Sequence, residues 1–531
     1  MSEIEEQDFI SALPDSLLSA IISLLPGTEG VRTCVLSQHW KIMWKYTSQL
    51  NFNQRLMLKP FIQPYLCRTN LRKRTFTRKI VHQDAIAQTE ILINSVLDSH
   101  LGSLKRCTIV HMPESCASGE AVAWMKKLVE QKKVKELYME RDVPTALQHV
   151  LRDVTRTLDL PFEIFTSFEV LELKNYKLKI SPSRDVSCQV LKTLTRKNVN
   201  VEVDACEGIL SYCSYLENLT LDGCSFEVVK IHSPKLKFFK IIKMVVTEFE
   251  VYAGNLEVFV INTVVCNPRK LVFVAPNVQT LCCFCNMEIG MRSFWPDGGK
   301  LLTSNEILNT STDIQSPQDP TTSFASTFEN LVTLRIDLDL KTITDAMTLF
   351  SALKSCPNIQ NVEINTHVSL LEQPYIILFN YIFICFSSAL RNSFFLLNSS
   401  TIIQGIISLM GLYDEHSNDD VLSCPKRLYW RQRDPYECVD HQLKTLCIRG
   451  FSGKELEVEF LKYIITTAET LQKITVWFVD NSSWAEATET LCLLSFQRAS
   501  KNLSIVLNPG PLYMEIVDGS FDEWVLSLRK N

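Results

Sequence analysis

Few residues in this sequence have the types and spacing that chemistry requires. Cys282, Cys283 and Cys285 form the tightest cysteine cluster, but no second Cys or His pair follows at the spacing of a zinc ribbon or RING site. Gly298-Gly299-Lys300 lacks the earlier glycine of a phosphate-binding loop, and no serine-nucleophile, zinc-protease or EF-hand motif occurs. The three thiols are therefore expected to pack at the end of a strand. The sequence predicts a non-catalytic protein without a cofactor or metal.

The composition is that of a folded protein with a large core. The 531 residues are 46% hydrophobic and 21% charged, which rules out global disorder. A net charge of −5 argues against a dedicated nucleic-acid-binding protein. The acidic start MSEIEEQDF has no apolar signal-peptide core. The 18 cysteines are therefore expected to be reduced and mostly buried, and the chain to be cytoplasmic, nuclear or both.

A pattern of large aliphatic residues, L-x-x-L-x-L with substitutions, recurs through the middle of the chain. Copies begin at Val134, Phe168, Leu216, Leu236, Leu256, Val278, Leu331 and Ile359. The consecutive starts at 216, 236, 256 and 278 are 20, 20 and 22 residues apart, within the range of leucine-rich repeats. Turns such as Ser233-Pro234-Lys235 precede several copies, whereas the asparagine ladder of regular repeats is mostly missing. We expect irregular leucine-rich repeats over residues 101–370, stacked into a solenoid with a parallel sheet on its concave face.

The first fifty residues are predicted to form three short helices. The first lies between Pro14 and Pro26, and its apolar face carries Leu17, Ile21, Leu24 and Leu25. Ser37 is a suitable N-cap for a third helix that carries Trp40 and Trp44. So short a segment cannot bury so many large apolar groups by itself, and one face is expected to need a partner.

The order Leu-Pro-Asp-x-Leu-Leu, Leu-Leu-Pro, Val-Arg-Thr-x-Val-Leu-Ser-x-x-Trp and a second Trp resembles the F-box of plant proteins over residues 8–52. The resemblance implies docking on a Skp-type adaptor, which links the F-box to a cullin and a RING subunit. Carried over by position, the adaptor-binding residues would be Leu13, Pro14, Leu17, Leu18, Ile21, Leu24, Leu25, Pro26, Val31, Val35, Leu36, Trp40 and Trp44. Departures from the family pattern at Gly27, Gly30, Gln38 and His39 are expected to weaken adaptor binding without abolishing it. The alternative is an ordinary helical subdomain packed on its own chain.

Residues 424–500 hold a further strand–helix–strand pattern. Leu443, Leu446 and Ile448 repeat the strand spacing, a helix is predicted over 455–471, and another strand begins at Leu471. The segments LKTLCIRGF and FLKYIITTAETLQKITV resemble the FBD domain of plant F-box proteins. We expect this domain to be a variant repeat that caps the solenoid.

Three segments interrupt this order. Residues 53–100 are interpreted as a linker with a helical basic segment, whose run 68–79 is either an import or acidic-partner patch or simply solvated surface. Residues 296–327 have the composition of a flexible loop. Residues 373–413 are almost uncharged and are a membrane span, a buried helical pair or an insertion foreign to the fold. The third interpretation is favoured, because the repeat pattern resumes near Cys424.

The predicted fold class is therefore α/β: a three-helix F-box, an irregular leucine-rich-repeat solenoid and a C-terminal FBD cap. The resemblance implies the substrate-recognition subunit of an SCF-type E3 ubiquitin ligase, which binds the adaptor through the F-box and a protein target through the repeats. A leucine-rich-repeat interaction scaffold outside any ligase is the alternative. The sequence does not identify the target, although alternating positions expected to be exposed include Glu217, Asn218, Thr220, Lys237, Lys240, Glu257 and Asn262.

Overall fold

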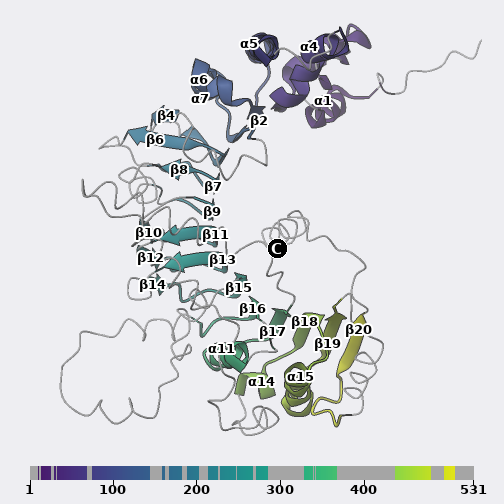
Figure 1. The fold of residues 1–531 in the computed structure, drawn as a ribbon, viewed down its shortest axis with the longest axis vertical. Coiled ribbons are helices and arrows are strands. Elements are labelled where there is room, and N and C mark those ends of the chain that lie inside the picture. Colours follow the sequence, from purple (N-terminus) through teal and green to yellow (C-terminus); the bar gives the residue numbers. More distant parts are fainter. Residues whose placement is uncertain are drawn as a thin grey trace, which may run out of the picture. The chain divides into compact units, whose positions relative to one another are not determined.

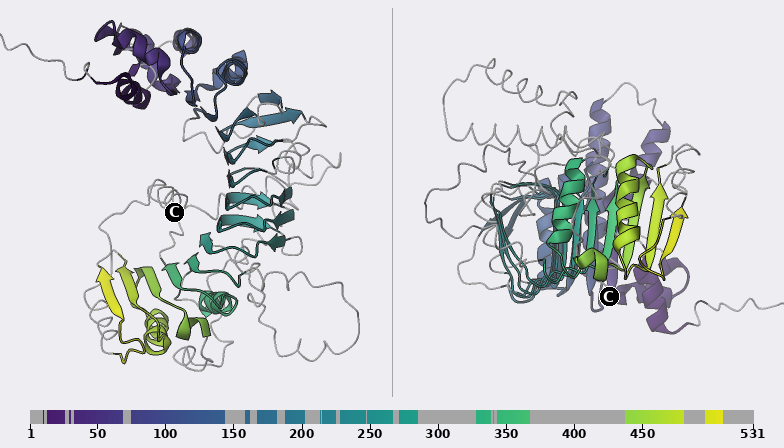
Figure 2. Two further views of the ribbon diagram at one scale, coloured as in Figure 1. Left: turned by 180° about the vertical axis from the view of Figure 1, so that it is seen from behind. Right: turned by 90° about the horizontal axis from the view of Figure 1, so that it is seen from below.

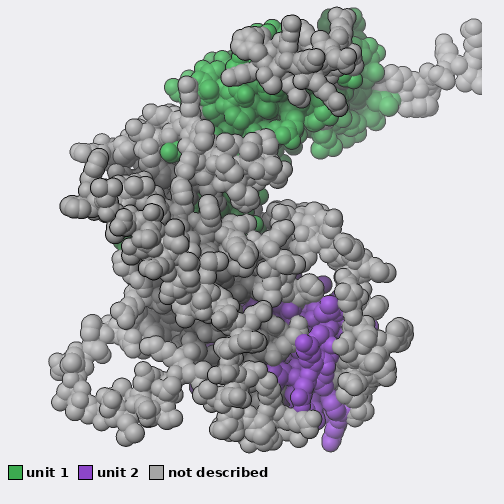
Figure 3. All heavy atoms as spheres, in the orientation of Figure 1, with its two compact units in different colours: residues 1–277 green, residues 278–531 purple. Residues whose placement is uncertain are grey.

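The computed structural model describes the chain in two compact units, residues 1–277 and 278–531 (Figure 3). The described residues are 10, 13–25, 29–30, 33–68, 75–143, 158–161, 167–181, 188–201, 213, 215–224, 228–246, 248–266, 271–284, 328–338, 340, 343–366, 437–479 and 496–508. The predicted loop at 296–327 and the apolar segment at 373–413 both lie entirely outside the described residues. Within the described residues, no helix combines the length and apolar character that crossing a membrane requires.

The first unit begins with helices and continues as stacked strands (Figure 1). Its helical elements are α1 (Asp15–Leu24), η1 (Thr33–Val35), α3 (Trp40–Met43), η2 (Trp44–Tyr46), α4 (Gln54–Arg68), α5 (Thr75–Ser99), α6 (Pro113–Ser118) and α7 (Glu120–Glu130). Its main strands are β1 (Gln49–Asn53), β2 (Arg106–His111), β3 (Glu136–Arg141), β5 (Val170–Lys174), β7 (Thr193–Lys197), β9 (Asn218–Asp222), β11 (Phe238–Val246) and β13 (Val258–Cys266). The strands of two further sheets are β4 (Leu158–Pro161), β6 (Lys177–Ser181), β8 (Asn200–Val201), β10 (Val228–His232), β12 (Glu248–Tyr252) and β14 (Leu271–Val274).

The main strands pair in parallel in the order β1-β2-β3-β5-β7-β9-β11-β13. Their register aligns the repeat pattern, since Leu219 of β9 lies opposite Phe239 of β11 and Phe239 opposite Phe259 of β13. The aliphatic positions predicted from the pattern face one core, and all three of these residues are buried. Each repeat thus buries its apolar face against the next repeat, as stacking requires.

A second layer of parallel strands closes this core. The sheets β4-β6-β8 and β10-β12-β14 are formed by the return segments of the repeats. Between the layers, the ring of Phe239 stacks on Phe249 at 6.3 Å and on Phe259 at 5.4 Å, and Phe259 stacks on Phe273 at 4.6 Å between ring centroids. This aromatic column joins successive repeats, because offset-stacked rings add to the stabilisation from burial.

Asparagine side chains form hydrogen bonds at the ends of several strands. Asn175 and Asn198 each follow a strand at positive φ; the Nδ2 of Asn175 donates to the carbonyl of Arg141 at 3.0 Å and that of Asn198 to the Oδ1 of Asn175 at 3.1 Å. In the turns before the strands, the Nδ2 groups of Asn255 and Asn277 donate at 2.7 Å to the carbonyls of the preceding turns. Short runs of asparagine hydrogen bonds thus occur at both ends of some strands, without forming the continuous ladder of regular repeats.

The second unit repeats the same principle with longer return segments. Its strands are β15 (Thr280–Phe284), β16 (Thr333–Asp337), β17 (Asn361–Asn365), β18 (Thr445–Phe451), β19 (Lys473–Phe478) and β20 (Ser504–Asn508), parallel in that order. The helices α11 (Ile343–Lys354), α14 (Glu437–His441) and α15 (Glu455–Thr467) lie on one face of this sheet (Figures 1 and 2). The opposite face carries the alternating side chains of the strands.

The prediction of a mixed α/β protein with a large parallel sheet is confirmed. Several strands were nevertheless not predicted, among them β2 and β7. β2 and the residues just before it do carry the pattern, as Leu104, Cys107 and Ile109, all buried. In β7 the third inward position is Arg196, which is fully buried where the pattern asks for an aliphatic residue.

One acidic side chain in the second unit has an unusual environment. The Oδ1 atom of Asp337, at the end of β16, is buried without a hydrogen-bond partner among the described residues. Burial raises the pKa of Asp337 to about 7, opposed by the positive charge of Arg335 and a hydrogen bond from Asn365, while Glu363 raises it further. The folded chain therefore holds a proton on this carboxyl that the unfolded chain releases at lower pH.

We expect Gly223→Ala to destabilise the first unit. Gly223 has a φ of +61°, and a Cβ there would lie 2.4 Å from the Oδ1 of Asn198, so strain and disruption of the asparagine ladder together should cost about 1–3 kcal/mol. Urea unfolding monitored by circular dichroism measures the loss. The matched control is Gly254→Ala, where a Cβ meets no atom within 4 Å; equal loss in both variants would contradict the assignment.

We also expect Asp337→Asn to change how stability depends on pH. Because the folded-state pKa is raised to about 7, the wild-type chain loses stability as the pH rises from about 4 to about 7 and has lost the full amount above that range. At pH 8 the Asn variant should be more stable by on the order of 4 kcal/mol, and the difference should vanish toward pH 4. Urea midpoints across this range measure it, and parallel pH profiles for the two proteins would refute the assignment.

Candidate functional site

The N-terminal helices surround a small core and leave large apolar side chains outside it. The core consists of Leu18, Ile22, Trp40, Met43 and Trp44, all buried, with Leu13 and Val96 packed against it. The outer side chains form what we call the N-terminal apolar set: Leu17 (52% exposed), Ile21 (42%), Leu24 (79%), Val35 (83%) and Leu36 (63%). Single exposed apolar residues are normal, but five within twenty residues of sequence indicate an interaction surface.

The residues predicted to bind an adaptor thus divide into two groups. Leu18, Trp40 and Trp44 lie in the core, so their side chains hold the helices together and are not available on the surface. Leu13 and Leu25 are half-buried and Pro14 is exposed as the N-cap of α1. The hydroxyl of Ser37 accepts a hydrogen bond from the amide of Trp40 at 3.3 Å, which is the expected capping contact. Pro26 and Val31 are outside the described residues.

His39, one of the departures from the F-box pattern, has a defined position. Its Nε2 lies 3.0 Å from the Oδ1 of Asp15 at the start of α1. The contact joins the first and third helices at the surface, where an ion pair with protonated histidine contributes little. The departure at Gly30 is buried against the side chain of Ile22, where a Cβ would come within 3.4 Å.

The helices that carry the apolar set are fixed to the sheet. The amides of Leu101 and Gly102 donate to the carbonyl of Lys45 at 2.8 and 2.9 Å, and the ring of His100 hydrogen-bonds the carbonyl of Thr47 at 2.9 Å. Two residues further on, β1 pairs with β2 as the first strands of the sheet. The predicted F-box range 8–52 therefore runs into the sheet.

A buried polar network strengthens this junction. Gln54, at the start of α4, is fully buried. Its Nε2 donates to the hydroxyl of Thr89 at 2.8 Å, and its Oε1 accepts from the amide of Met112 at 2.7 Å and the hydroxyl of Ser115 at 3.2 Å. One side chain thus joins α4, α5 and the end of β2. Most of 53–100, predicted as a linker and a basic segment, consists of the helices α4 and α5. The side chains of the entire basic run 68–79 are outside the description.

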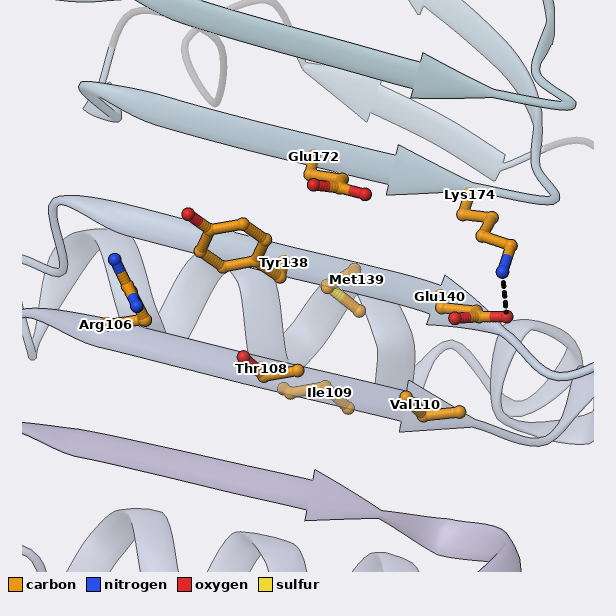
Figure 4. A pocket seen from close by; sticks show the side chains of 9 residues that line it. All are labelled: Arg106, Thr108, Ile109, Val110, Tyr138, Met139, Glu140, Glu172 and Lys174. Carbon is orange, nitrogen blue, oxygen red and sulfur yellow. Dashed lines mark ion pairs between the residues drawn. The ribbon is translucent and has the colours of Figure 1, made fainter. Parts of the chain in front are cut away.

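The outward face of β2, β3 and β5 forms an open pocket of about 330 Å³ (Figure 4). The ring of Tyr138 lies at its centre, with the guanidinium of Arg106 5.4 Å from the ring centroid. Lys174 pairs with Glu140 at 3.0 Å across neighbouring strands. Tyr and Arg side chains that are partly exposed on a rigid sheet are the types that dominate protein interfaces.

The outward face of the second unit has a different charge arrangement. The Oε1 of Glu363 on β17 lies 2.7 Å from the Nε of Arg449 on β18 and 3.5 Å from the Nη2 of Arg335 on β16. The guanidinium of Arg449 also lies 5.6 Å from the ring centroid of Trp477 on β19. Two arginines thus converge on one carboxylate oxygen beside an aromatic ring.

Some surface positions expected from the sequence are not exposed. Thr220 and Lys240 occupy outward positions of β9 and β11, yet only 3% and 4% of each residue is accessible. The pocket residues Arg106 and Tyr138 and the cluster around Glu363 were not singled out. The alternation of the strands was the signal that could have found them, because their register follows from the repeat pattern.

The cysteines of the described residues are unbridged and mostly buried. Burial raises the pKa of the Cys282 thiol to about 12, which favours the protonated, unreactive form. Cys283 is also buried on β15, and Cys285 lies outside the described residues. No group of three or more potential metal ligands occurs in the part of the chain that the structure describes.

Comparison with known proteins finds two family models and several plant proteins with similar sequences. The family described as FBD matches residues 431–476, and the leucine-rich repeats of the "FBD-associated F-box protein At5g56370" match residues 121–364. The chain is 27% identical over 297 residues to the "F-box protein At1g80960" of Arabidopsis thaliana, covering 52% of this chain and 54% of the relative. It is 26% identical over 242 residues to the "Putative F-box/FBD/LRR-repeat protein At2g05300" of the same plant, covering 45% and 47%.

A longer match has lower identity. The "Putative F-box/LRR-repeat protein At5g54820" of Arabidopsis thaliana is 21% identical over 546 residues, covering 94% of this chain and 98% of the relative. In the matches of highest significance the chain spans about half the length of the curated relatives. The resemblance predicted from the motifs is confirmed: this chain is a relative of the plant F-box/FBD/LRR-repeat proteins.

Proposed function

We propose that this chain is the substrate-recognition subunit of an SCF-type E3 ubiquitin ligase. Its N-terminal helices bind a Skp-type adaptor, and through it a cullin–RING assembly, while the outward faces of the sheet bind a protein target. The observation that carries this proposal is the N-terminal apolar set, five large side chains exposed around a buried helical core. The relatives named above, which include F-box proteins, support the same assignment.

The adaptor interface follows from the exposure of these side chains. Leu17, Ile21 and Leu24 follow one another at helical spacing on α1, so they present one continuous stripe. Burying a Leu or Val side chain contributes about 1.5–3 kcal/mol, so a few such contacts are enough for specific binding. The three-helix F-box fold is part of this proposal.

The mechanism requires no chemistry by this chain. A ligase subunit acts by holding its target near a ubiquitin-charged enzyme, which raises the effective concentration of the reacting groups. That mechanism benefits from a rigid connection, and the hydrogen bonds from Leu101, Gly102 and His100 to the segment after α3 supply one. In this proposal the FBD region is a variant repeat that caps the solenoid, and the protein works in the cytoplasm, the nucleus or both.

The double variant Leu24→Asp/Val35→Asp should lose adaptor binding while the chain remains folded. Both side chains are mostly exposed, so the substitutions spare the core but place two charges in an apolar interface, and we expect binding to weaken about 100-fold or more. Co-expression with a plant Skp-type adaptor and calorimetric titration of the purified proteins measure the loss.

The matched control is Ile91→Asp on α5, which removes an apolar side chain of comparable exposure, 59%, outside the apolar set. It should bind the adaptor like the wild type. Failure of the folded wild type to bind any adaptor would overturn the ligase assignment and leave the repeat scaffold. Equal weakening by Ile91→Asp would show that the interface lies elsewhere.

A further inference from the structure

The outward face of β16–β19 in the second unit concentrates positive charge beside an aromatic ring. Arg335, Arg449 and Trp477 occupy alternating positions of these strands, and Lys473 is exposed at the start of β19. The helices α11, α14 and α15 lie on the other face (Figure 2). We call the residues Arg335, Arg449, Lys473 and Trp477 the basic face.

The acidic residues on this surface neutralise only part of that charge. Glu363 is shared by Arg335 and Arg449 through the same oxygen atom. Asp337 is the other acidic residue at outward positions of the described strands β16–β19, and burial raises its pKa to about 7. Near neutral pH it therefore carries only part of a negative charge.

On the corresponding face of the first unit, positive and negative side chains are balanced differently. There, Arg106 pairs with Glu136 at 2.5 Å, Lys174 with Glu140 at 3.0 Å and Lys197 with Glu172 at 3.6 Å, each cation with its own carboxylate. Just before the strands of the first unit, Lys135 and Lys192 do share Glu169, at 2.8 and 3.3 Å. On the strands themselves these three pairs balance their charges, so the excess of positive charge on β16–β19 does not follow from the repeat architecture itself.

We propose that the basic face binds an acidic, extended segment of the target protein. This inference rests on the proposed function and names the chemistry of the target that it recognises. The contact of Glu363 with two guanidinium groups shows the geometry that an incoming carboxylate would adopt. Arg449, whose side chain is 45% exposed, and Lys473 provide donors to that segment, and the ring of Trp477 provides the adjoining apolar surface.

Charge complementarity then determines both the rate and the selectivity of binding. Charged groups on a partly exposed face accelerate encounter with an oppositely charged partner and reject like charge, and salt weakens both effects. Arg and Trp are also among the residue types whose truncation at an interface costs the most binding free energy. The basic face combines these two properties on one rigid sheet.

The test uses the full-length chain and two fluorescent peptides of alternating charge, (Glu-Ala)4 and (Lys-Ala)4. Anisotropy titration should show binding of the glutamate peptide, little binding of the lysine peptide, and about tenfold or greater weakening between about 0.05 and 0.3 M NaCl. In the double variant Arg449→Gln/Lys473→Gln, the affinity for the glutamate peptide should fall about tenfold or more.

The matched control is Lys230→Gln, which neutralises a cation of the separate β10-β12-β14 sheet that lies 3.4 Å from Glu248. It should change peptide binding by less than about twofold. Absence of binding, equal binding of both peptides, or equal weakening by the control would overturn the basic face as an acidic-segment site. Adaptor binding is measured in parallel for every variant, so loss of peptide binding with retained adaptor binding refutes this inference alone. Failure of the wild type to bind the adaptor refutes the proposed function.

Discussion

The structure depends on one constraint: no repeat can bury its apolar face by itself. In the first unit, the inward residues of each strand lie directly opposite those of the next, so that Leu219, Phe239 and Phe259 form one continuous row. Parallel pairing satisfies the backbone along the strands, and the asparagine side chains satisfy carbonyl groups where the strands begin and end. Stacking thus fixes half of the side chains of every strand and leaves the other half available for recognition.

The same constraint makes the N-terminal helices part of the sheet's framework. Two residues separate the end of η2 from β1, which pairs with β2, so only a short stretch of backbone lies between the helical core and the first repeat. Gly102 illustrates how close the two parts come, since a Cβ there would lie 2.7 Å from the Cα of Tyr46. The N-terminal apolar set and the repeat surfaces of this unit are therefore positioned by direct packing, and no flexible joint among the described residues separates them.

The sequence predicted the strands better than the surfaces, for a physical reason. Strand positions follow from a period-two pattern of buried residues, and even the neighbouring turns recur. The orientation of α1 does not follow in the same way, because Leu17 and Leu18 are both apolar and only packing against Trp40 and Trp44 decides that Leu18 is the buried one. Similarly, Arg196 interrupts the pattern of β7 because a buried guanidinium at an inward position has no signature in local sequence.

Charge is the remaining variable, because stacking leaves the outward residues unconstrained by the core. One-to-one ion pairs such as Lys174 with Glu140 make part of the first unit's face electrically balanced, whereas Arg335 and Arg449 share a single carboxylate in the second. Partly exposed ion pairs add little to folding stability, so the two arrangements differ little in what they contribute to the fold. They differ greatly in the potential that an approaching protein meets. A repeat fold can therefore change its partner through outward charges while its inward rows, and hence its shape, stay the same.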